Sequence, residues 1–302
     1  QSQAAYRPGR STTEHIFATK LAIERTITSK NEEFFLILLD MTKAFDSISR
    51  EKLLTDLEEI IDQDELHIMQ LMLNVRLSVK CGSYQSEYFE TDTGAPQGDC
   101  ASANEFTLYL AKTLQGTYHP TNVQPQDHCY VTHEHPNLVE HLVDHDYFIQ
   151  TKSEHLDIKQ EYADDLSRLT SDKNEIQFMT ENLPKILKAR DLIINEPKTE
   201  EYHIARKGKC DDKWKECKLL GSLLDTEKDI ERRKCLVASV IKTLKNILYS
   251  KKLSISTKVR VFDAYVAPVF LYNSELWTLS NSINNKLDSY HRKKFELGSF
   301  SS

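Results

Sequence analysis

Three aspartates in this 302-residue chain stand where aspartate is unexpected. Asp164 and Asp165 lie between apolar residues in the segment QEYADDLSRLT, and Asp40 ends the apolar run EEFFLILLD. Aspartate is unfavourable in strands and costly to bury without a partner. Carboxylates brought together also repel each other, by about 4 kcal/mol per pair at ~4 Å and an effective dielectric of ~20. A fold that keeps such a cluster must neutralise it.

Divalent metal ions neutralise carboxylate clusters of this kind. Hard oxygen ligands suit Mg2+, and two ions about 3.5–4 Å apart clamp the attacking and leaving oxygens of a phosphoryl transfer. The residues alone leave two interpretations of the Asp164–Asp165 pair open: a metal site, or exposed aspartates in a turn. Asp211 and Asp212, which lie among lysines in KGKCDDKWKE, are a pair of the second kind.

The elements that position these carboxylates follow from the apolar pattern. The run from Phe34 to Leu39 is too short for a buried helix and predicts a central strand, buried on both faces, that ends at Asp40. The aspartate pair, in a short apolar segment with polar flanks, predicts a hairpin tip. Other predicted elements are helices over 11–30, 49–61, 64–75, 101–114, 171–190, 229–250, 254–270 and 281–297, a hairpin over 75–94, and strands over 199–205 and 215–224.

Charge is distributed unevenly along the chain. The net charge is −7, but residues 231–302 contain 13 Lys and Arg against 5 Asp and Glu. A basic C-terminal region attached to an acidic body is typical of a surface that grips a polyanion. A solvated helical surface is the alternative.

Several protein classes are excluded by composition. No apolar run approaches the ~20 residues that a membrane helix needs, and no signal peptide is visible. The six cysteines form no CxxC pair, which argues against a zinc ribbon or a disulfide scaffold and fits a reducing, intracellular compartment. The chain begins without Met, so we expect it to be part of a longer protein.

Residues of about 115–157 differ from the rest of the chain. They are rich in Pro, His and Asp, lack periodicity, and predict an irregular insertion. His141 and His145 are four residues apart and Cys129 is nearby, so a zinc site is one interpretation. The spacings match no structural zinc pattern, which favours an elaborated loop.

Five motifs, LLDMTKAFDSI, GAPQGD, YADD, LIINEPKTE and LLGSLL, follow one another along the chain. In this order they resemble the successive motifs of reverse transcriptases, and in detail those of the non-LTR retrotransposon (LINE-type) branch. QAAYRPGRSTTEHIF resembles that branch's fingers segment, and TKVRVFDAYVAPVFLYNSELWTL resembles the stretch after its palm. The resemblance covers nearly the whole chain.

The resemblance implies an α/β (α+β) right-hand polymerase fold with partial fingers, a palm that carries the catalytic sheet, and a helical thumb. Residues 1–32 correspond to the partial fingers and 33–225 to the palm. The palm includes fingers-like helices and a hairpin at about 50–93 and the His-rich insertion. Residues 226–302 correspond to the thumb and a C-terminal helical extension.

The resemblance also assigns the metal site. Asp40 and Asp164 match the two metal-binding aspartates of the family, and Asp165 matches a third that generally touches metal less directly. The backbone carbonyl of Met41 is a further candidate ligand. Tyr162 precedes the pair at the hairpin turn, where the family's primer end lies. The implied cofactor is two Mg2+ ions, with Mn2+ as a substitute.

Nucleotide-binding residues are implied as well. Phe45, five residues after Asp40, matches the aromatic gate that fills the space of a ribose 2′-OH; a core Phe is the alternative, and the spacing favours the gate. Gln97 matches the residue that lies against the incoming nucleotide in the family. Gly98, which has no side chain, allows the backbone to approach that nucleotide closely. Either Arg7 or Arg10 holds the triphosphate in this scheme. Lys198 matches a lysine near the leaving pyrophosphate, a candidate general acid.

The remaining implied residues bind the template–primer duplex. Leu220 and Gly221 match the primer-grip hairpin, which positions the primer through its backbone. Basic residues of the thumb are candidate contacts to the nucleic-acid backbone, with salt-dependent and sequence-independent affinity. They are Arg232, Arg233, Lys234, Lys242, Lys245, Lys251, Lys252, Lys258 and Arg260.

The implied activity is that of an RNA-directed DNA polymerase that extends a primer 3′-OH with dNTPs. Its partners are an RNA template, a DNA primer or nicked target DNA, and dNTPs, without a membrane, and the family implies a nuclear location. Two departures bear on activity: Glu105 lies near an apolar slot after GAPQGD, and Asn273 replaces a common Gly in LYNSELW. A polymerase-fold binding protein that has lost catalysis, and an RNA-dependent RNA polymerase, are therefore the alternatives.

Overall fold

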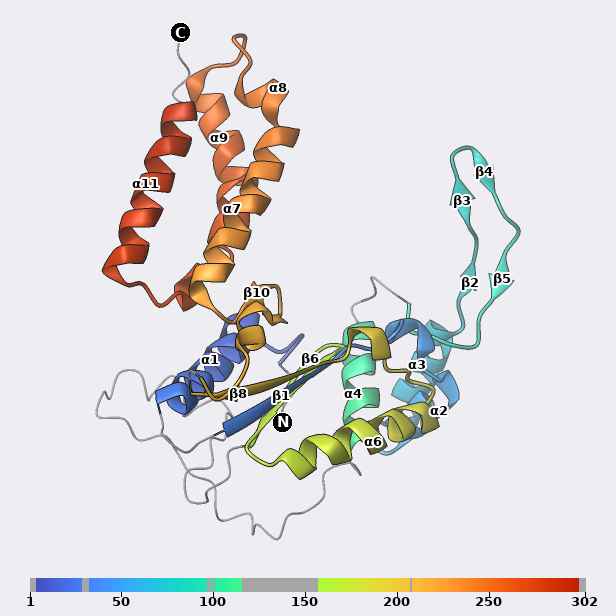
Figure 1. Ribbon diagram of the computed structural model, residues 1–302. Helices are drawn as coiled ribbons and strands as arrows, with labels where there is room; N and C mark the ends of the chain where they lie inside the picture. The colour runs from blue at the N-terminus through green and yellow to red at the C-terminus, as the bar shows by residue number, and fades with distance from the viewer. Residues whose placement is uncertain are drawn as a thin grey trace. The chain divides into compact units, whose positions relative to one another are not determined.

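An antiparallel sheet of four strands, in the order β6–β7–β1–β8, lies at the centre of the first of two compact units (Figure 1). The computed structural model describes residues 4–28, 33–96, 99, 101–115, 157–206 and 208–298. The first unit comprises 1–12 and 23–210, and the second comprises 13–22 and 211–302. The expected mixture of helices and sheet is confirmed.

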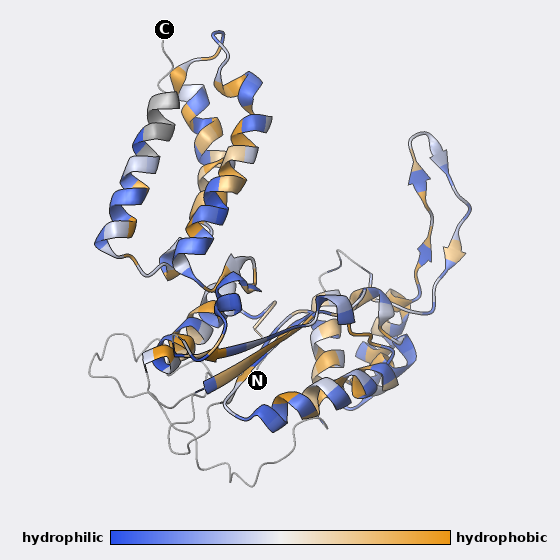
Figure 2. Ribbon diagram, in the orientation of Figure 1, coloured by the Kyte–Doolittle hydropathy of each residue, from blue (hydrophilic) through white to orange (hydrophobic). Residues whose placement is uncertain are grey.

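Strand β1 (Glu33–Leu39) is the central strand that its apolar run predicts. It pairs with β7 (Asp165–Thr170) on one side and with β8 (Glu200–Ala205) on the other. Strand β6 (Asp157–Tyr162) pairs with β7 at the edge. Figure 2 shows β1 as a largely hydrophobic strand, and its residues Leu36 and Ile37 are almost wholly buried. A strand with a neighbour on each side satisfies its backbone groups without water, so it tolerates a continuous apolar run.

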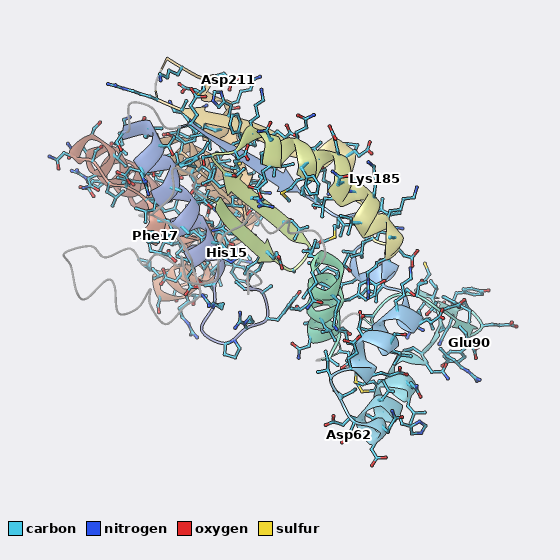
Figure 3. The ribbon with its side chains drawn as sticks, turned by 90° about the horizontal axis from the view of Figure 1, so that it is seen from below. His15, Phe17, Asp62, Glu90, Lys185 and Asp211 are labelled. Atoms are coloured by element: carbon cyan, nitrogen blue, oxygen red, sulfur yellow. The ribbon has the colours of Figure 1, made fainter. Side chains whose placement is uncertain are left out.

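Helices complete the core of the first unit. They are α2 (Arg50–Glu58), α3 (Gln63–Leu73), α4 (Ser102–Leu114) and α6 (Lys173–Ala189). Helix α6 packs on β1 and β7 through buried Leu183 and Leu187, whereas Figure 3 shows Lys185 on the outer side of this helix. Pro184 lies inside α6 without interrupting it.

The predicted hairpin after α3 is confirmed. It consists of β2 (Arg76–Leu77), β3 (Lys80–Cys81), β4 (Tyr84–Gln85) and β5 (Phe89–Glu90), with β2 paired to β5 and β3 to β4. Gly82 has φ +62° at the tip, a conformation that glycine adopts without steric cost. Figure 1 shows this hairpin extending away from the helices of its unit.

The second unit is mainly helical. Its short hairpin pairs β9 (Lys218–Leu219) with β10 (Ser222–Leu223). The helices are α7 (Thr226–Thr243), α8 (Lys245–Leu248), α9 (Ile255–Tyr265), α10 (Ala267–Leu271) and α11 (Asn281–Gly298). Asp225 and Ser254 cap α7 and α9, each accepting a backbone N–H three residues on. Helix α1 (Thr12–Thr28) contributes residues 13–22 to this unit.

The boundary between the units bears on the predicted domains. The second unit resumes at Asp211, so the β9–β10 hairpin groups with the helices that follow it rather than with the four-stranded sheet. The assignment of fingers, palm and thumb to particular residues stays a prediction. Among the described helices, none has the length and apolarity to span a membrane. The His-rich insertion lies outside the described residues, except at its edges.

Candidate active site

Strand register brings the three aspartates to one end of the sheet. Strands β6 and β7 form a tight hairpin in which Tyr162 pairs with Asp165, so Ala163 and Asp164 make the turn. Leu39 lies opposite Leu166. The residue after Leu39 is Asp40, which therefore lies beside this turn. Two elements far apart in sequence thus carry carboxylates to neighbouring strand ends, as the apolar pattern predicts.

The turn itself is held in an unusual conformation. Ala163 has φ +54°, in the left-handed region where residues with a side chain are uncommon. Asp164 is half-buried and Asp165 is exposed. Strained backbone of this kind persists only where surrounding structure holds it, and it concentrates at functional sites. The hairpin between two packed strands supplies that support here.

Asp40 is embedded in a polar network. Its carboxylate accepts a hydrogen bond from Asn195 Nδ2 at 3.2 Å and forms an ion pair with Lys198 Nζ at 3.0 Å. The Asn195 N–H donates to the Asp40 carbonyl at 2.8 Å. Lys198 belongs to a 3-10 helix, η2 (Glu196–Lys198), and thus lies next to the predicted metal ligand. Asn195 was not identified from the sequence; its position three residues before Lys198 was the only signal.

The backbone around Met41 is compatible with its role as a ligand. Met41 forms an isolated bridge with Ile194, and the bonds of this bridge come from Asp40 and Thr42 on either side. The bridge therefore does not use the Met41 carbonyl. The Met41 side chain is buried, so only its backbone oxygen is a candidate.

The donor set fits a hard divalent cation. It consists of carboxylates at adjacent strand ends and a backbone carbonyl, the oxygen ligands that Mg2+ prefers. Within the described ranges, no group of three His, Cys, Asp or Glu side chains is close enough to hold a metal ion by itself. Lys198 instead supplies the positive charge that Asp40 contacts. The Asp40 carboxylate thus has a positively charged partner within the chain.

Phe45 lies at the exit from β1, between the core and solvent. It starts a short 3-10 helix, η1 (Phe45–Ser47), and its ring stacks on Phe106 of α4 with centroids 4.4 Å apart. Its carbonyl accepts the Ala95 N–H at 3.0 Å. Phe106 is fully buried, whereas Phe45 is half-buried. The ring is therefore packed against the core and remains partly exposed to solvent.

The loop GAPQGD packs closely against Phe45. Gly94 has φ +83°, and a Cβ at this position would come within 3.1 Å of the Asp46 backbone. The Gly94 N–H donates to the Ile48 carbonyl at 2.8 Å. Only glycine satisfies both the backbone angle and the close approach. Gln97 and Gly98 lie outside the described residues, so their roles stay predictions.

Glu105, which the sequence places near an apolar slot, is a buried carboxyl on α4. It is 4% exposed, and its Oε2 has no hydrogen-bond partner in the part of the chain that the structure describes. Burial raises the pKa of this group, the nearby Asp99 raises it further, and Arg50 opposes the shift. The Arg50 side chain donates hydrogen bonds to other groups: Nε donates to the Gly94 carbonyl at 2.8 Å, and Nη2 donates to the Thr91 hydroxyl.

The replacement Glu105→Gln is expected to stabilise the protein at neutral and higher pH. A folded-state pKa above the unfolded value means that the folded protein holds the proton more tightly. The contribution of Glu105 to the free energy of unfolding is therefore fully present below its pKa in the unfolded state. It is lost as the pH rises through its pKa in the folded state. Removal of the ionisable group should raise the free energy of unfolding by about 1 kcal/mol above that pH, with little change in acid.

Urea unfolding at roughly pH 4 and pH 8, on either side of the expected titration, measures this effect. Glu58→Gln, at an exposed position of α2, is the control and should change neither value. A larger loss of stability in Glu105→Gln at high pH than at low pH would show instead that the ionised carboxylate is used by Arg50.

The arginines at the N-terminus lie near the hairpin with the aspartates. The Ala4 N–H donates to the Glu161 carbonyl at 2.9 Å, one residue before Tyr162. A turn follows in which the Arg10 N–H donates to the Arg7 carbonyl at 3.2 Å. Both arginine side chains are half-buried and each has an interaction partner. The segment is therefore anchored to β6, and phosphate binding by Arg7 or Arg10 stays a prediction.

Two of the predicted nucleic-acid contacts, Arg233 and Lys258, have buried side chains, and their contact with nucleic acid stays a prediction. Arg233 is 5% exposed, and its Nη2 donates to the Gly221 carbonyl at 2.6 Å. Lys258 is 6% exposed. Arg232 Nη1 also donates to the Gly221 carbonyl, at 2.9 Å, and Lys234 pairs with Glu231 at 2.8 Å. The exposed members of the set are Lys242, Lys245, Lys251, Lys252 and Arg260.

Comparison with known proteins adds a family match. The family model described as reverse transcriptase (RNA-dependent DNA polymerase) matches residues 1–224. No curated protein matches the chain. Among solved structures, telomerase from Candida albicans in complex with a TWJ fragment of telomeric RNA is 13% identical, over 92% of this chain and 45% of that chain, with a TM-score of 0.49. The corresponding complex of telomerase from Candida tropicalis is 11% identical, over 99% of this chain and 44% of that chain, with a TM-score of 0.48. The chain spans less than half the length of these telomerases.

Proposed function

Because this chain belongs to the reverse transcriptase (RNA-dependent DNA polymerase) family, we propose that it extends a primer 3′-OH with dNTPs on an RNA template. The observation that carries the proposal is the convergence of Asp40 with the Ala163–Asp164 turn at one end of the sheet. Carboxylates at that place bind the metal ions that such a transfer uses.

Asp40, Asp164 and Asp165 would hold two Mg2+ ions, with Mn2+ as a substitute and the Met41 carbonyl as a further ligand. Bound there, the ions supply charge stabilisation for the attacking and leaving oxygens. Lys198 is the group of this chain that holds a proton nearby, on Nζ at 3.0 Å from the Asp40 carboxylate. A protonated amine at this position stabilises, and can protonate, a leaving pyrophosphate.

Other residues of this chain orient and select the nucleotide. Phe45, fixed against Phe106, narrows the space beside the sugar. The arginine that follows the anchored segment at Ala4, either Arg7 or Arg10, binds the triphosphate. The resemblance assigns nucleotide contacts to Gln97 and Gly98, which lie outside the described residues, and a place by the primer end to Tyr162. The chemistry thus depends on positioning as much as on charge.

The finer proposal is that this chain is the reverse transcriptase of a non-LTR (LINE-type) retrotransposon. The support for it is the ordered set of motifs, from RPGRST to LYNSELW, that resembles this branch. In that setting the primer is nicked target DNA, the template is the element's RNA, and the protein acts in the nucleus. These partners belong to the proposal.

Primer extension by the wild-type chain tests the proposed function. A DNA primer annealed to an RNA template is incubated with Mg2+ and either dNTPs or rNTPs. Extension with dNTPs and little extension with rNTPs is expected. Binding of the duplex without extension would favour a polymerase fold that has lost catalysis. Preferential extension with rNTPs would identify an RNA polymerase.

The exposed lysines after α8 are expected to contribute salt-dependent affinity for the duplex. Removing one lysine–phosphate interaction lowers the slope of log affinity against log salt by about 0.9. The double variant Lys251→Gln and Lys252→Gln should therefore reduce the slope by about 2 and weaken binding at low salt. Fluorescence anisotropy of a labelled RNA–DNA duplex over a salt series measures this.

The matched control removes two charges from the outer side of α6, with Lys185→Gln and Lys188→Gln, which are both exposed. It should leave the slope unchanged. Equal slopes in wild type and in the Lys251 and Lys252 variant would show that these lysines do not touch phosphate.

A further inference from the structure

The tip of the β9–β10 hairpin has a backbone that must be held in place. Leu220 and Gly221 both have positive φ, +45° and +86°, as in a type I′ turn. The left-handed conformation is unfavourable for leucine. A turn with such a residue keeps one geometry only if its surroundings impose it.

Both carbonyl groups of the turn are captured by side chains. The Tyr272 hydroxyl donates to the Leu220 carbonyl at 3.1 Å. Arg232 and Arg233 both donate to the Gly221 carbonyl, at 2.9 and 2.6 Å. The Arg233 guanidinium also lies over the Tyr272 ring, 4.8 Å from its centroid. The turn, the tyrosine and the arginine therefore form one packed unit.

The segment from Tyr272 to Trp277 is tied to the hairpin at two further points. Asn273 Nδ2 donates to Ser222 Oγ at 3.1 Å. Trp277 Nε1 donates to Asp229 at 3.0 Å, and Asp229 also accepts the Leu223 N–H at 2.9 Å. Asp229 is fully buried. The Asp229 carboxylate has two hydrogen-bond donors and two arginines nearby. Removal of one of these partners would leave a buried charge uncompensated, which is strongly destabilising, so Asp229 holds these segments together.

This arrangement also explains a departure in the sequence. Asn273 has φ +56°, in the left-handed region that favours glycine and, among other residues, asparagine. Glycine, the common residue at this position in the resembling family, would adopt the same backbone. Asn273 keeps the conformation and adds the bond to Ser222. The substitution is thus compatible with an intact hairpin.

Fixing the carbonyls fixes the direction of the amides. In a trans peptide the C=O and N–H groups point in opposite directions. With the Leu220 carbonyl bound to Tyr272, the Gly221 N–H points away from that side chain. No hydrogen bond of the Gly221 N–H is found within the described residues. A backbone donor held in a fixed direction suits a phosphodiester oxygen, which it contacts without reading sequence.

We propose that residues 272–277, together with Arg233, act as a clamp that sets the orientation of the Leu220–Gly221 peptide toward the primer strand. Tyr272 and Arg233 are then positioning residues for the primer, and Asp229 and Trp277 hold the clamp together. The inference rests on the proposed function, since it requires a primer to be bound at this hairpin.

The replacement Tyr272→Phe tests the clamp, because it removes one hydroxyl and keeps the ring. The expected result is a dissociation constant for an RNA–DNA template–primer about fivefold higher, which corresponds to the removal of one hydrogen bond. The KM for primer should rise similarly, while the KM for dNTP and the melting temperature stay near the wild-type values. A purely structural role would lower the melting temperature and leave the ratio of the two KM values unchanged.

Tyr265→Phe is the matched control, since Tyr265 is an exposed tyrosine of α9. Arg233→Lys is a second variant, and it should weaken primer binding in the same direction. Unchanged primer affinity in both Tyr272→Phe and Arg233→Lys, with wild-type extension intact, would overturn the clamp. Primer binding without any extension by wild type would overturn the proposed function alone.

Discussion

The replacement Asp164→Asn is expected to reduce the rate of primer extension by a factor of about 10^3 or more. The amide keeps the shape of the turn after Ala163 but loses the charge that the proposed metal site requires. Metal ions supply several kcal/mol of stabilisation to such transition states, and each loss of about 1.4 kcal/mol slows the reaction tenfold. Asp40→Asn should have a similar effect, because Asp40 lies on the neighbouring strand end.

Single-turnover extension on an RNA template measures this prediction, with the melting temperature as a check on folding. Asp211→Asn is the matched control: it alters an adjacent aspartate pair that lies in a lysine-rich exposed segment and pairs with Lys213. Equal rates for Asp164→Asn and wild type would remove Asp164 from the metal site. An equal loss in Asp211→Asn would show that the effect is not specific to the hairpin.

The replacement Phe45→Ala is expected to relax discrimination against rNTPs by about 10- to 100-fold. The Phe45 ring stacks on Phe106, with 4.4 Å between centroids, and this contact opposes displacement of the ring by a 2′-OH. Truncation opens that space, and steric selectivity in an apolar pocket is of this size. The measurement is the ratio of kcat/KM for dATP and ATP opposite one template base.

Loss of the aromatic ring also lowers stability, by about 3 kcal/mol, so a control must separate the two effects. Phe178→Ala removes a partly exposed aromatic ring from α6 and should leave the selectivity ratio unchanged. An unchanged ratio in Phe45→Ala would return Phe45 to the core-residue interpretation. It would also remove the main argument against an RNA polymerase.

Periodicity predicted much of the first unit. The central strand follows from a continuous apolar run that only a paired, doubly covered strand accommodates, and the aspartate hairpin follows from its polar flanks. Family membership agrees with the predicted right-hand polymerase fold class, and the activity belongs to the proposal. The placement of residues 1–32, 33–225 and 226–302 in fingers, palm and thumb stays a prediction.

Side-chain burial in the helical unit was not predictable in the same way. A lysine or arginine carries the same charge in the sequence whether it faces solvent or the interior. Arg233 and Lys258 are therefore indistinguishable by pattern from exposed Lys251 and Lys252, yet both are buried. The clamp was missed for a related reason: Tyr272, Asp229 and the turn meet only after the helices pack.

The contact between Lys198 and Asp40 was only half predicted. The sequence placed both residues at the site by resemblance, but it gave no reason for a direct ion pair. The bridge at Met41 and Ile194 brings the segment after α6 against the end of β1, and Asn195 and Lys198 then reach the carboxylate. Long-range backbone pairing of this kind has no local signature.

The most direct test of the central claim is incorporation of a single nucleotide by the wild-type chain. A DNA primer is annealed to four RNA templates that differ only in the first unpaired base, and each is offered the four dNTPs separately with Mg2+. The complementary dNTP should be added in each case, and Asp164→Asn should add it more slowly by a factor of about 10^3 or more. Binding of the primer–template by the wild-type chain without template-directed addition would contradict the claim.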